Sequence, residues 1–169
     1  MTFKVFGIGL SRTGTTTLNN VLNQWGWNTI HYPNAEQLSD PKSHGFTDIP
    51  AAVFHKELDK TFPGSKFIYT IRNKEEWLDS VVPYLERKRG WPMSKRQLDY
   101  RVKLFGDPFP NRFQASTAWD RYDANVRGWF GDRMLVIDII GGDSPQKLAQ
   151  YLGIKTDMTE FPHLNRLEK

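Results

Sequence analysis

The residues that first indicate chemistry form a glycine- and threonine-rich segment near the start of the chain, residues 9–17 (GLSRTGTTT). Its two glycines have the G-x-x-x-x-G spacing of a phosphate-binding loop. Glycines permit positive φ angles and close backbone approach, and N–H groups at the start of a helix attract an anion. Arg12 adds the positive charge of this segment. We therefore expect a phosphate-like group to bind here.

The residue after the second glycine separates two classes of phosphate-binding protein. A P-loop kinase or NTPase continues with Gly-Lys-[Ser/Thr], and its lysine reaches the β- and γ-phosphates. Thr15 occupies that position here, whereas Arg12 can direct two donors at an anion near the centre of the loop. Thr15 therefore argues against a kinase or NTPase. That alternative stays open because Asp138 follows an apolar run, as the aspartate of a Walker B strand does.

A second basic position follows another predicted strand. Arg72 comes directly after residues 66–71 (KFIYTI), and Ser80 lies eight residues later on a predicted helix. An arginine at the end of a strand and a hydroxyl from the next helix can converge on one phosphate. Either residue alone is weak evidence, but together with the first loop they predict a ligand that carries two separate phosphates.

Residues 11–16 (SRTGTT) resemble the 5′-phosphosulfate loop of the sulfotransferases that use 3′-phosphoadenosine 5′-phosphosulfate (PAPS). Arg72 and Ser80 keep the interval of that family's 3′-phosphate motif. Shorter similarities extend the resemblance over most of the chain: 48–50 (DIP), 62–67 (FPGSKF), 152–153 (LG) and 161–165 (FPHLN). The resemblance implies a P-loop NTPase-like fold, with PAPS as the sulfuryl donor and PAP as the product.

The resemblance also implies roles for single residues. Arg12 contacts the 5′-phosphate and the oxygen that bridges phosphorus and sulfur, and it stabilises charge because arginine does not release a proton at neutral pH. Backbone and hydroxyl donors are expected from Thr13, Gly14, Thr15, Thr16 and Thr17. The cation that completes the 3′-phosphate site is open between Arg166, Lys169 and the basic residues that follow Glu86.

Sulfuryl transfer to a hydroxyl or amine needs a base near the acceptor and no obligatory metal. Two residues are candidates. His31 ends a predicted strand, and an imidazole needs little tuning to act as a base near neutral pH. Asp48 stands where relatives have an acidic motif, although it also suits an N-cap of the following helix. The interpretation favours Asp48 slightly and leaves both open. The other histidines lack metal-ligand spacing, so no metal is expected.

The elements that must position these residues follow from hydrophobic periodicity. Strands are predicted at 3–9, 28–31, 66–71 and 134–139, and helices at 15–25, 50–62, 74–87, 94–104, 114–130 and 144–152. This alternation is typical of a three-layer α/β fold with a parallel sheet of about four to five strands flanked by helices. Ligands bind at the carboxyl ends of such strands, so the turns after Ile8 and Ile71 are the expected sites.

Length and composition limit the number of domains and the classes of protein that are possible. The chain has 169 residues, so residues 1–169 are expected to form a single domain, and 38% hydrophobic content supports a folded core. The net charge of +4 favours an anionic ligand without implying nucleic acid. The lack of cysteine excludes disulfides and thiolate metal sites, and it fits a cytoplasmic protein. No apolar run is long enough to cross a membrane, and no targeting signal is visible.

The acceptor is predicted only as a class, a small molecule or a glycan, and the oligomeric state is left open. The first function hypothesis is a sulfotransferase that moves a sulfuryl group from PAPS to a hydroxyl or amine by in-line displacement. Two alternatives are kept, a P-loop kinase or NTPase and a nucleotide-binding module without catalysis.

Overall fold

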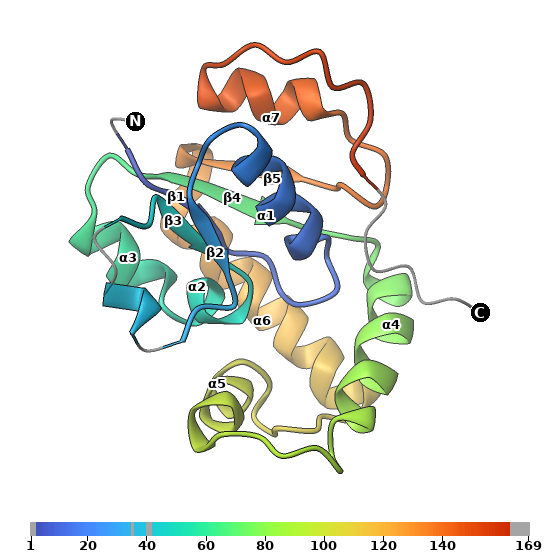
Figure 1. Cartoon of the computed structure of the whole chain (residues 1–169). Coiled ribbons are helices and arrows are strands. Elements are labelled where there is room, and N and C mark those ends of the chain that lie inside the picture. The colour runs from blue at the N-terminus through green and yellow to red at the C-terminus, as the bar shows by residue number, and fades with distance from the viewer. Residues whose placement is uncertain (1–2, 35, 40–41, 163–169) are drawn as a thin grey trace. The chain divides into compact units, whose positions relative to one another are not determined.

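The computed structural model spans the whole chain and describes residues 3–34, 36–39 and 42–162 (Figure 1). Arg166, Lys169 and the motif residues 163–165 lie outside the described residues. The strands of the described part are β1 (Val5–Gly7), β2 (Thr29–His31), β3 (Gly45–Thr47), β4 (Lys66–Thr70) and β5 (Met134–Ile137). Its helices are α1 (Thr15–Gln24), α2 (Ile49–Val53), α3 (His55–Thr61), α4 (Lys74–Arg87), α5 (Lys95–Phe105), α6 (Arg112–Phe130) and α7 (Pro145–Leu152), with 3-10 turns η1 (Gln37–Ser39) and η2 (Gly131–Arg133).

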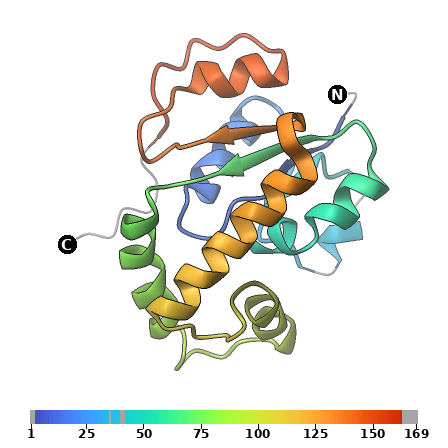
Figure 2. The same ribbon diagram turned by 180° about the vertical axis from the view of Figure 1, so that it is seen from behind.

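The strands form one sheet in the order β2-β3-β1-β4-β5, and all four neighbouring pairs are parallel. The predicted α/β class with a parallel sheet is therefore confirmed. Figure 2 shows β4 and β5 side by side and pointing the same way. The order places β1 at the centre, so the loop that follows β1 has a strand end on either side of it.

Alternating side chains bury the two faces of the sheet against different helices. On one face, Val5, Ile68 and Ile137 belong to a buried cluster with Leu18 of α1 and Leu148 of α7. On the other face, Phe6 contacts the rings of Phe46, Phe67 and Phe62, and Phe62 directly follows α3. These two apolar layers fix the sheet between helices, which is why its polar groups collect at the strand ends.

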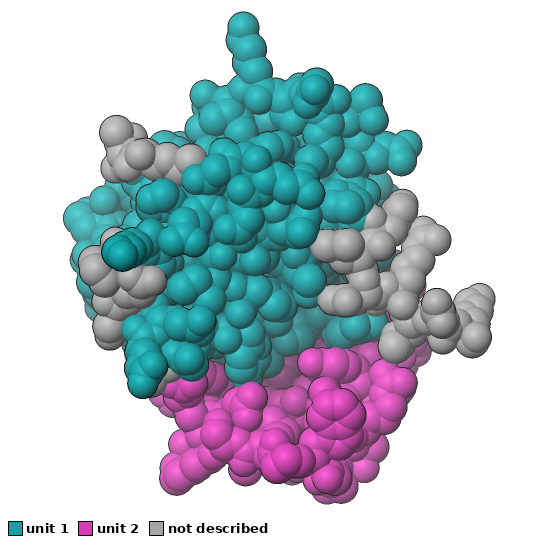
Figure 3. Space-filling view, in the orientation of Figure 1, with its two compact units in different colours: residues 1–72, 132–169 teal, residues 73–131 magenta. Residues whose placement is uncertain are grey.

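The chain divides into two compact units, Met1–Arg72 with Asp132–Lys169, and Asn73–Gly131 (Figure 3). The first unit contains the sheet. The second consists of α4, α5 and α6, and its core is aromatic. Trp77 is fully buried there, with its ring centroid 4.6 Å from Trp119 and 6.4 Å from Phe105.

Two local predictions differ from the structure. Gly45–Thr47 forms β3, a strand that the sequence analysis did not predict, because three residues are too short to show a period. The predicted helix over 50–62 is two helices, since Phe54 leaves helical geometry (φ −106°, ψ 20°) between α2 and α3. In the described segments, no helix combines the length and the apolar character that a bilayer crossing requires.

Candidate functional site

Polar residues collect at the carboxyl edge of the sheet. His31 is the last residue of β2, Asp48 follows β3, and Thr70 ends β4. The loop that follows β1 lies among them because β1 is hydrogen-bonded to both β3 and β4. His31, Asp48 and the loop after β1 therefore lie together at the edge that the strand pattern predicted.

Thr13 anchors the loop to the end of β4. Its side chain is fully buried, and its hydroxyl donates to the Leu10 carbonyl oxygen at 2.7 Å. Because that hydroxyl has one proton, the 2.7 Å contact with the Thr70 hydroxyl is donated by Thr70. The Thr13 N–H also points to the Leu10 carbonyl, at 3.3 Å. Both donors of Thr13 are therefore used inside the loop, and the residue shapes it.

Gly9 is required by the same packing. A Cβ atom at Gly9 would lie 2.7 Å from the Thr13 hydroxyl oxygen and 2.6 Å from the Thr70 carbonyl oxygen. Neither neighbour can move without breaking the anchor described above. The first glycine of the motif thus permits close approach between the loop and β4 rather than an unusual φ angle.

The start of α1 has the features of an anion site. Gly14 is the N-cap at φ 94°, no side chain caps the helix, and its first turn has no acidic residue. Arg12, two residues before Gly14, also has a positive φ of 74°, which is uncommon for a residue with a Cβ. The N–H groups of a first helical turn have no partner within the helix. The loop therefore suits a phosphate group in both charge and geometry.

The threonines that follow Gly14 differ in what their hydroxyls contact. Thr15 and Thr17 are buried, and the Thr17 hydroxyl donates to the Pro162 carbonyl oxygen at 3.3 Å. Thr16 is half-buried, and its hydroxyl lies 3.2 Å from Nε2 of His31. The predicted donor role of these hydroxyls toward a ligand stays a prediction.

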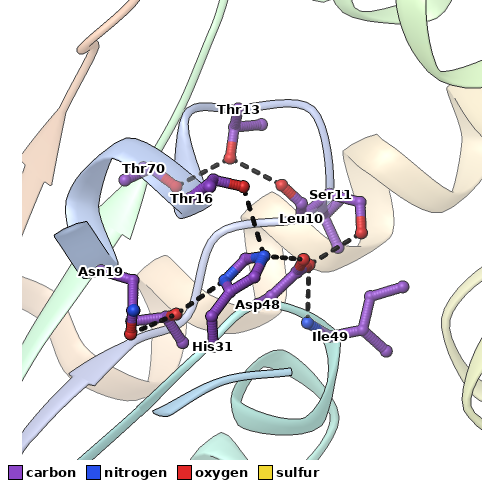
Figure 4. A network of polar contacts seen from close by, with 10 residues as sticks. Leu10, Ser11, Thr13, Thr16, Asn19, His31, Asp48, Ile49 and Thr70 are labelled. Carbon is purple, nitrogen blue, oxygen red and sulfur yellow. Dashed lines mark hydrogen bonds and ion pairs between the residues drawn. The ribbon is translucent and has the colours of Figure 1, made fainter. Parts of the chain in front are cut away.

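Asp48 and His31, the two candidate bases, contact each other (Figure 4). Oδ2 of Asp48 lies 3.3 Å from Nε2 of His31. Oδ1 accepts the Ser11 hydroxyl at 2.7 Å and the Ile49 N–H at 2.8 Å. Asp48 is therefore the N-cap of α2, as its position suggested, and it is also bonded to Ser11 of the predicted phosphate-binding loop, residues 9–17, called the anion-binding loop below.

The backbone at Asp48 is unusual. Its φ is 75° and its ψ is −163°, a combination that costs energy for a residue other than glycine. The structure holds it there through the Asp48 N–H, which donates to the Gly7 carbonyl oxygen at 3.2 Å, and through the cap on α2. Such strain is found where a side chain must be aimed at a particular place.

Arg72 and Ser80 belong to different compact units. Arg72 follows β4 after Ile71, whose N–H donates to the Ile137 carbonyl oxygen at 2.9 Å. Ser80 lies on α4, which begins after Asn73 caps it by accepting the Glu76 N–H at 3.2 Å. Their convergence on one phosphate stays a prediction.

The loop after β5 is a self-contained turn. The Asp138 carboxylate accepts the Gly141 N–H at 2.7 Å, and Asp143 accepts the Asp138 N–H at 2.7 Å. Burial opposes the ionisation of Asp143, but hydrogen bonds from Lys147 and from the Asp138 N–H hold its pKa below the usual value. Asp138 thus stabilises a turn, which gives a structural role to the residue that resembled a Walker B aspartate.

The hydroxyls of Ser11 and Thr47 contact Asp48 and His31, respectively, and neither residue was singled out from the sequence. Ser11 belongs to the quoted motif, and a hydroxyl beside Arg12 was a usable signal. Thr47 gave none, because its strand was not predicted.

Comparison with known proteins places this chain in a family. A model of the sulfotransferase domain matches residues 41–169, more than half of the chain. The chain therefore belongs to the sulfotransferase family, as the motif at 11–16 predicted. The matched range includes Asp48, Arg72 and Ser80, whereas the anion-binding loop precedes it. Among curated proteins, no match is found.

Among solved structures, 23 chains match. One is the crystal structure of mouse sulfotransferase SULT7A1 complexed with PAP, which matches with a TM-score of 0.51 and 16% sequence identity. The match covers 93% of this chain and 60% of the mouse chain, so this chain spans less than two thirds of that protein. At this identity, the similarity shows a shared fold.

Proposed function

We propose that this protein transfers a sulfuryl group from PAPS to an acceptor hydroxyl or amine and releases PAP. The observation that carries the proposal is the 2.7 Å hydrogen bond from Ser11, in the anion-binding loop, to Asp48, the candidate base. This hydrogen bond connects the loop that would bind the sulfuryl donor with the residue that would act as the base. The sulfotransferase domain match and the similarity to a fold solved with PAP support the proposal.

The residues of the loop fit the donor. The start of α1, with its glycine N-cap and no acidic first turn, would hold the 5′-phosphosulfate together with Arg12. Arg12 carries a fixed positive charge, so it would stabilise the charge that develops on the leaving phosphate. Arg72 and Ser80 would hold the 3′-phosphate, which distinguishes PAPS from ATP.

Asp48 would take the proton of the acceptor. In the transfer, the bond between sulfur and the phosphate oxygen breaks, and a bond between sulfur and the acceptor oxygen or nitrogen forms. The acceptor proton passes to the Asp48 carboxylate, and the leaving phosphate keeps the electron pair of the broken bond. The proposed acceptor is a small molecule or a glycan, the proposed location is the cytoplasm, and no metal takes part.

The first experiment is calorimetric titration of PAP, of ADP with Mg²⁺ and of 5′-AMP. We expect PAP to bind at least about tenfold more tightly than the others, a difference of about 1.4 kcal/mol. Arg12→Ala and Arg72→Ala should each weaken PAP binding by about 10-fold to 100-fold, because each removes a charged hydrogen-bond donor. Arg133→Ala is the matched control, since Arg133 pairs with Asp59 at 2.9 Å. Unchanged PAP affinity in both Arg12→Ala and Arg72→Ala, or tighter binding of Mg-ADP, would overturn the proposal.

Catalysis is tested separately with labelled PAPS and panels of hydroxyl and amine acceptors, with and without EDTA. We expect transfer that EDTA does not reduce and that Asp48→Asn lowers by about 10²-fold or more. PAP binding without transfer to any acceptor would favour the alternative of a binding module. Loss of transfer in EDTA would contradict the metal-free reaction.

A further inference from the structure

His31 and Asp48 were considered as alternative bases, but the structure joins them. Nε2 of His31 lies 3.3 Å from Oδ2 of Asp48 and 3.2 Å from the Thr16 hydroxyl. Nδ1 lies 3.0 Å from the Thr47 hydroxyl. Both ring nitrogens are thus held, and the histidine bridges α1, β3 and the candidate base.

The hydrogen-bond pattern assigns the protons of the imidazole. The Thr47 hydroxyl donates its proton to Oδ1 of Asn19 at 3.3 Å, so it accepts from Nδ1 of His31. The other nitrogen, Nε2, faces a carboxylate oxygen that can only accept. The 3.3 Å contact is an ion pair when both ring nitrogens carry a proton.

The contacts of the Asp48 carboxylate also indicate which of its two oxygens can take a proton. Oδ1 accepts two hydrogen bonds, from the Ser11 hydroxyl and the Ile49 N–H, and both of its lone pairs are used. Oδ2 lies 3.3 Å from Nε2 of His31, and no hydrogen bond of the network uses all of its lone pairs. Oδ2 can therefore receive a proton from an acceptor without breaking any bond of the network.

We propose that His31 is a positioning residue that fixes Oδ2 of Asp48 as the proton-accepting atom and ties it to the anion-binding loop. The inference rests on the proposed function. Ser11 precedes Arg12 in the loop, and Thr16 lies in the first turn of α1, on the other side of Gly14. Ser11 contacts Asp48 directly, and Thr16 contacts it through His31. The anion-binding loop therefore orients Asp48 at two points, Ser11 on one side of Gly14 and Thr16 on the other.

The geometry explains why two contacts are needed. A carboxylate on a single Cβ can rotate about χ2, and a hydrogen bond to one oxygen leaves that rotation partly free. Contacts on both oxygens stop it. Misplacement of a catalytic group by about 1 Å can cost on the order of 100-fold in rate. Loss of His31 should therefore slow the reaction while leaving the loop able to bind its ligand.

The kinetic test uses His31→Ala, His31→Gln, Asp48→Asn and the double variant His31→Ala/Asp48→Asn. We expect His31→Ala to lower kcat by about 10-fold to 100-fold, with PAP affinity changed less than about threefold. His31→Gln should recover part of the rate, because an amide N–H can replace Nε2 as the donor to Asp48. Adding His31→Ala to Asp48→Asn should cause little further loss, since a positioning residue acts only through its partner.

His44→Gln is the matched control, because His44 lies outside the network and its Nδ1 accepts the Asn28 N–H at 3.0 Å. Equal additional losses from His31→Ala in both backgrounds would overturn the proposal, since His31 would then act independently of Asp48. A His31→Gln rate no better than that of His31→Ala, in a folded protein that binds PAP normally, would also overturn it. Full transfer activity in Asp48→Asn would refute the role of Asp48 as the base, whereas a wild type that transfers to no acceptor would refute the proposed function itself.

A spectroscopic test does not depend on catalysis. In the wild type, ¹⁵N NMR should show the His31 imidazole protonated at Nδ1 and hydrogen-bonded to a carboxylate at Nε2. In Asp48→Asn, we expect the Nε2 signal to shift and the Nδ1 signal to stay, because Thr47 still anchors Nδ1. A spectrum in which neither signal moves would show that the contact between His31 and Asp48 is absent in solution and would overturn the proposal.

Discussion

Replacement of Thr13 by valine tests whether a buried hydroxyl holds the anion-binding loop in place. Valine has the shape of threonine, so Thr13→Val changes hydrogen bonding with little change in volume. The variant loses the 2.7 Å bonds to the Leu10 carbonyl oxygen and to the Thr70 hydroxyl. Thr13 and Thr70 are both fully buried, so water does not replace these bonds at the native site.

The magnitude follows from the partners left behind. A buried polar group without a partner costs about 1–3 kcal/mol. The Leu10 carbonyl oxygen keeps the 3.3 Å bond from the backbone N–H of residue 13, whereas the Thr70 hydroxyl loses its acceptor, so we expect Thr13→Val to lower the free energy of unfolding by about 1–3 kcal/mol. Thr70→Val should cost about 0.5–1.5 kcal/mol, because it removes one hydrogen bond while the Thr13 hydroxyl keeps its bond to the Leu10 carbonyl oxygen. The double variant removes both hydroxyls together, so its cost should fall below the sum of the single costs by about 1–2 kcal/mol.

Equilibrium unfolding in urea measures all three free energies, with the exposed Thr61→Val on α3 as a control expected to change little. PAP titration of Thr13→Val should also show weaker binding, because the loop loses its anchor on β4. A cost below about 0.5 kcal/mol for Thr13→Val, or single costs that simply add, would refute the reasoning.

Three further predictions concern the fold. Gly45→Ala should lower the free energy of unfolding, measured by urea titration, by more than about 3 kcal/mol, because the new Cβ would lie 2.7 Å from the Val5 carbonyl carbon. Gly64→Ala is the control. Its Cβ would meet nothing within 4 Å, so it should cost only about 1 kcal/mol of backbone strain. Burial raises the pKa of Tyr151 above its usual value of 10.0, so the folded state keeps a proton that the unfolded chain loses. Stability should then fall as the pH rises above about 10, and urea midpoints should show Tyr151→Phe losing less over that range. Trp77→Ala should cost about 3–5 kcal/mol in the helical unit, measured by the loss of protected amides in hydrogen exchange, and a cost below about 1 kcal/mol would contradict the aromatic core.

Local sequence signals predicted the helices well where apolar residues recur at helical spacing and capping residues mark the ends. The structure confirms α4 at Lys74–Arg87, the predicted range, and the helix continues through Pro83. It also confirms α7, with Pro145 in its first turn and Gly153 as its C-cap at φ 73°. Both helices are encoded by neighbouring residues, through the 3.6-residue period and through capping.

Short strands were predicted less well because their stability comes from partners distant in sequence. β3 is three residues long and lies between β2 and β1, so its identity depends on pairing that no local window contains. The break at Phe54 has a similar origin, since the apolar period of 50–62 continues across both helices while the backbone turns between them.

The sequence by itself determined the parallel α/β class and the sulfotransferase family, and it predicted a phosphate-binding loop at residues 9–17, because each depends on residues that are near one another in the chain. The contact between His31 and Asp48 was decided only by the tertiary structure. These residues lie 17 positions apart in the sequence, and the side-by-side pairing of β2 and β3 brings their strand ends together. Ser11 completes the network because β1 is the next strand in the sheet. A sheet order is set by the burial of two apolar faces over the whole unit, so the residues that meet at its edge emerge only when the chain has folded.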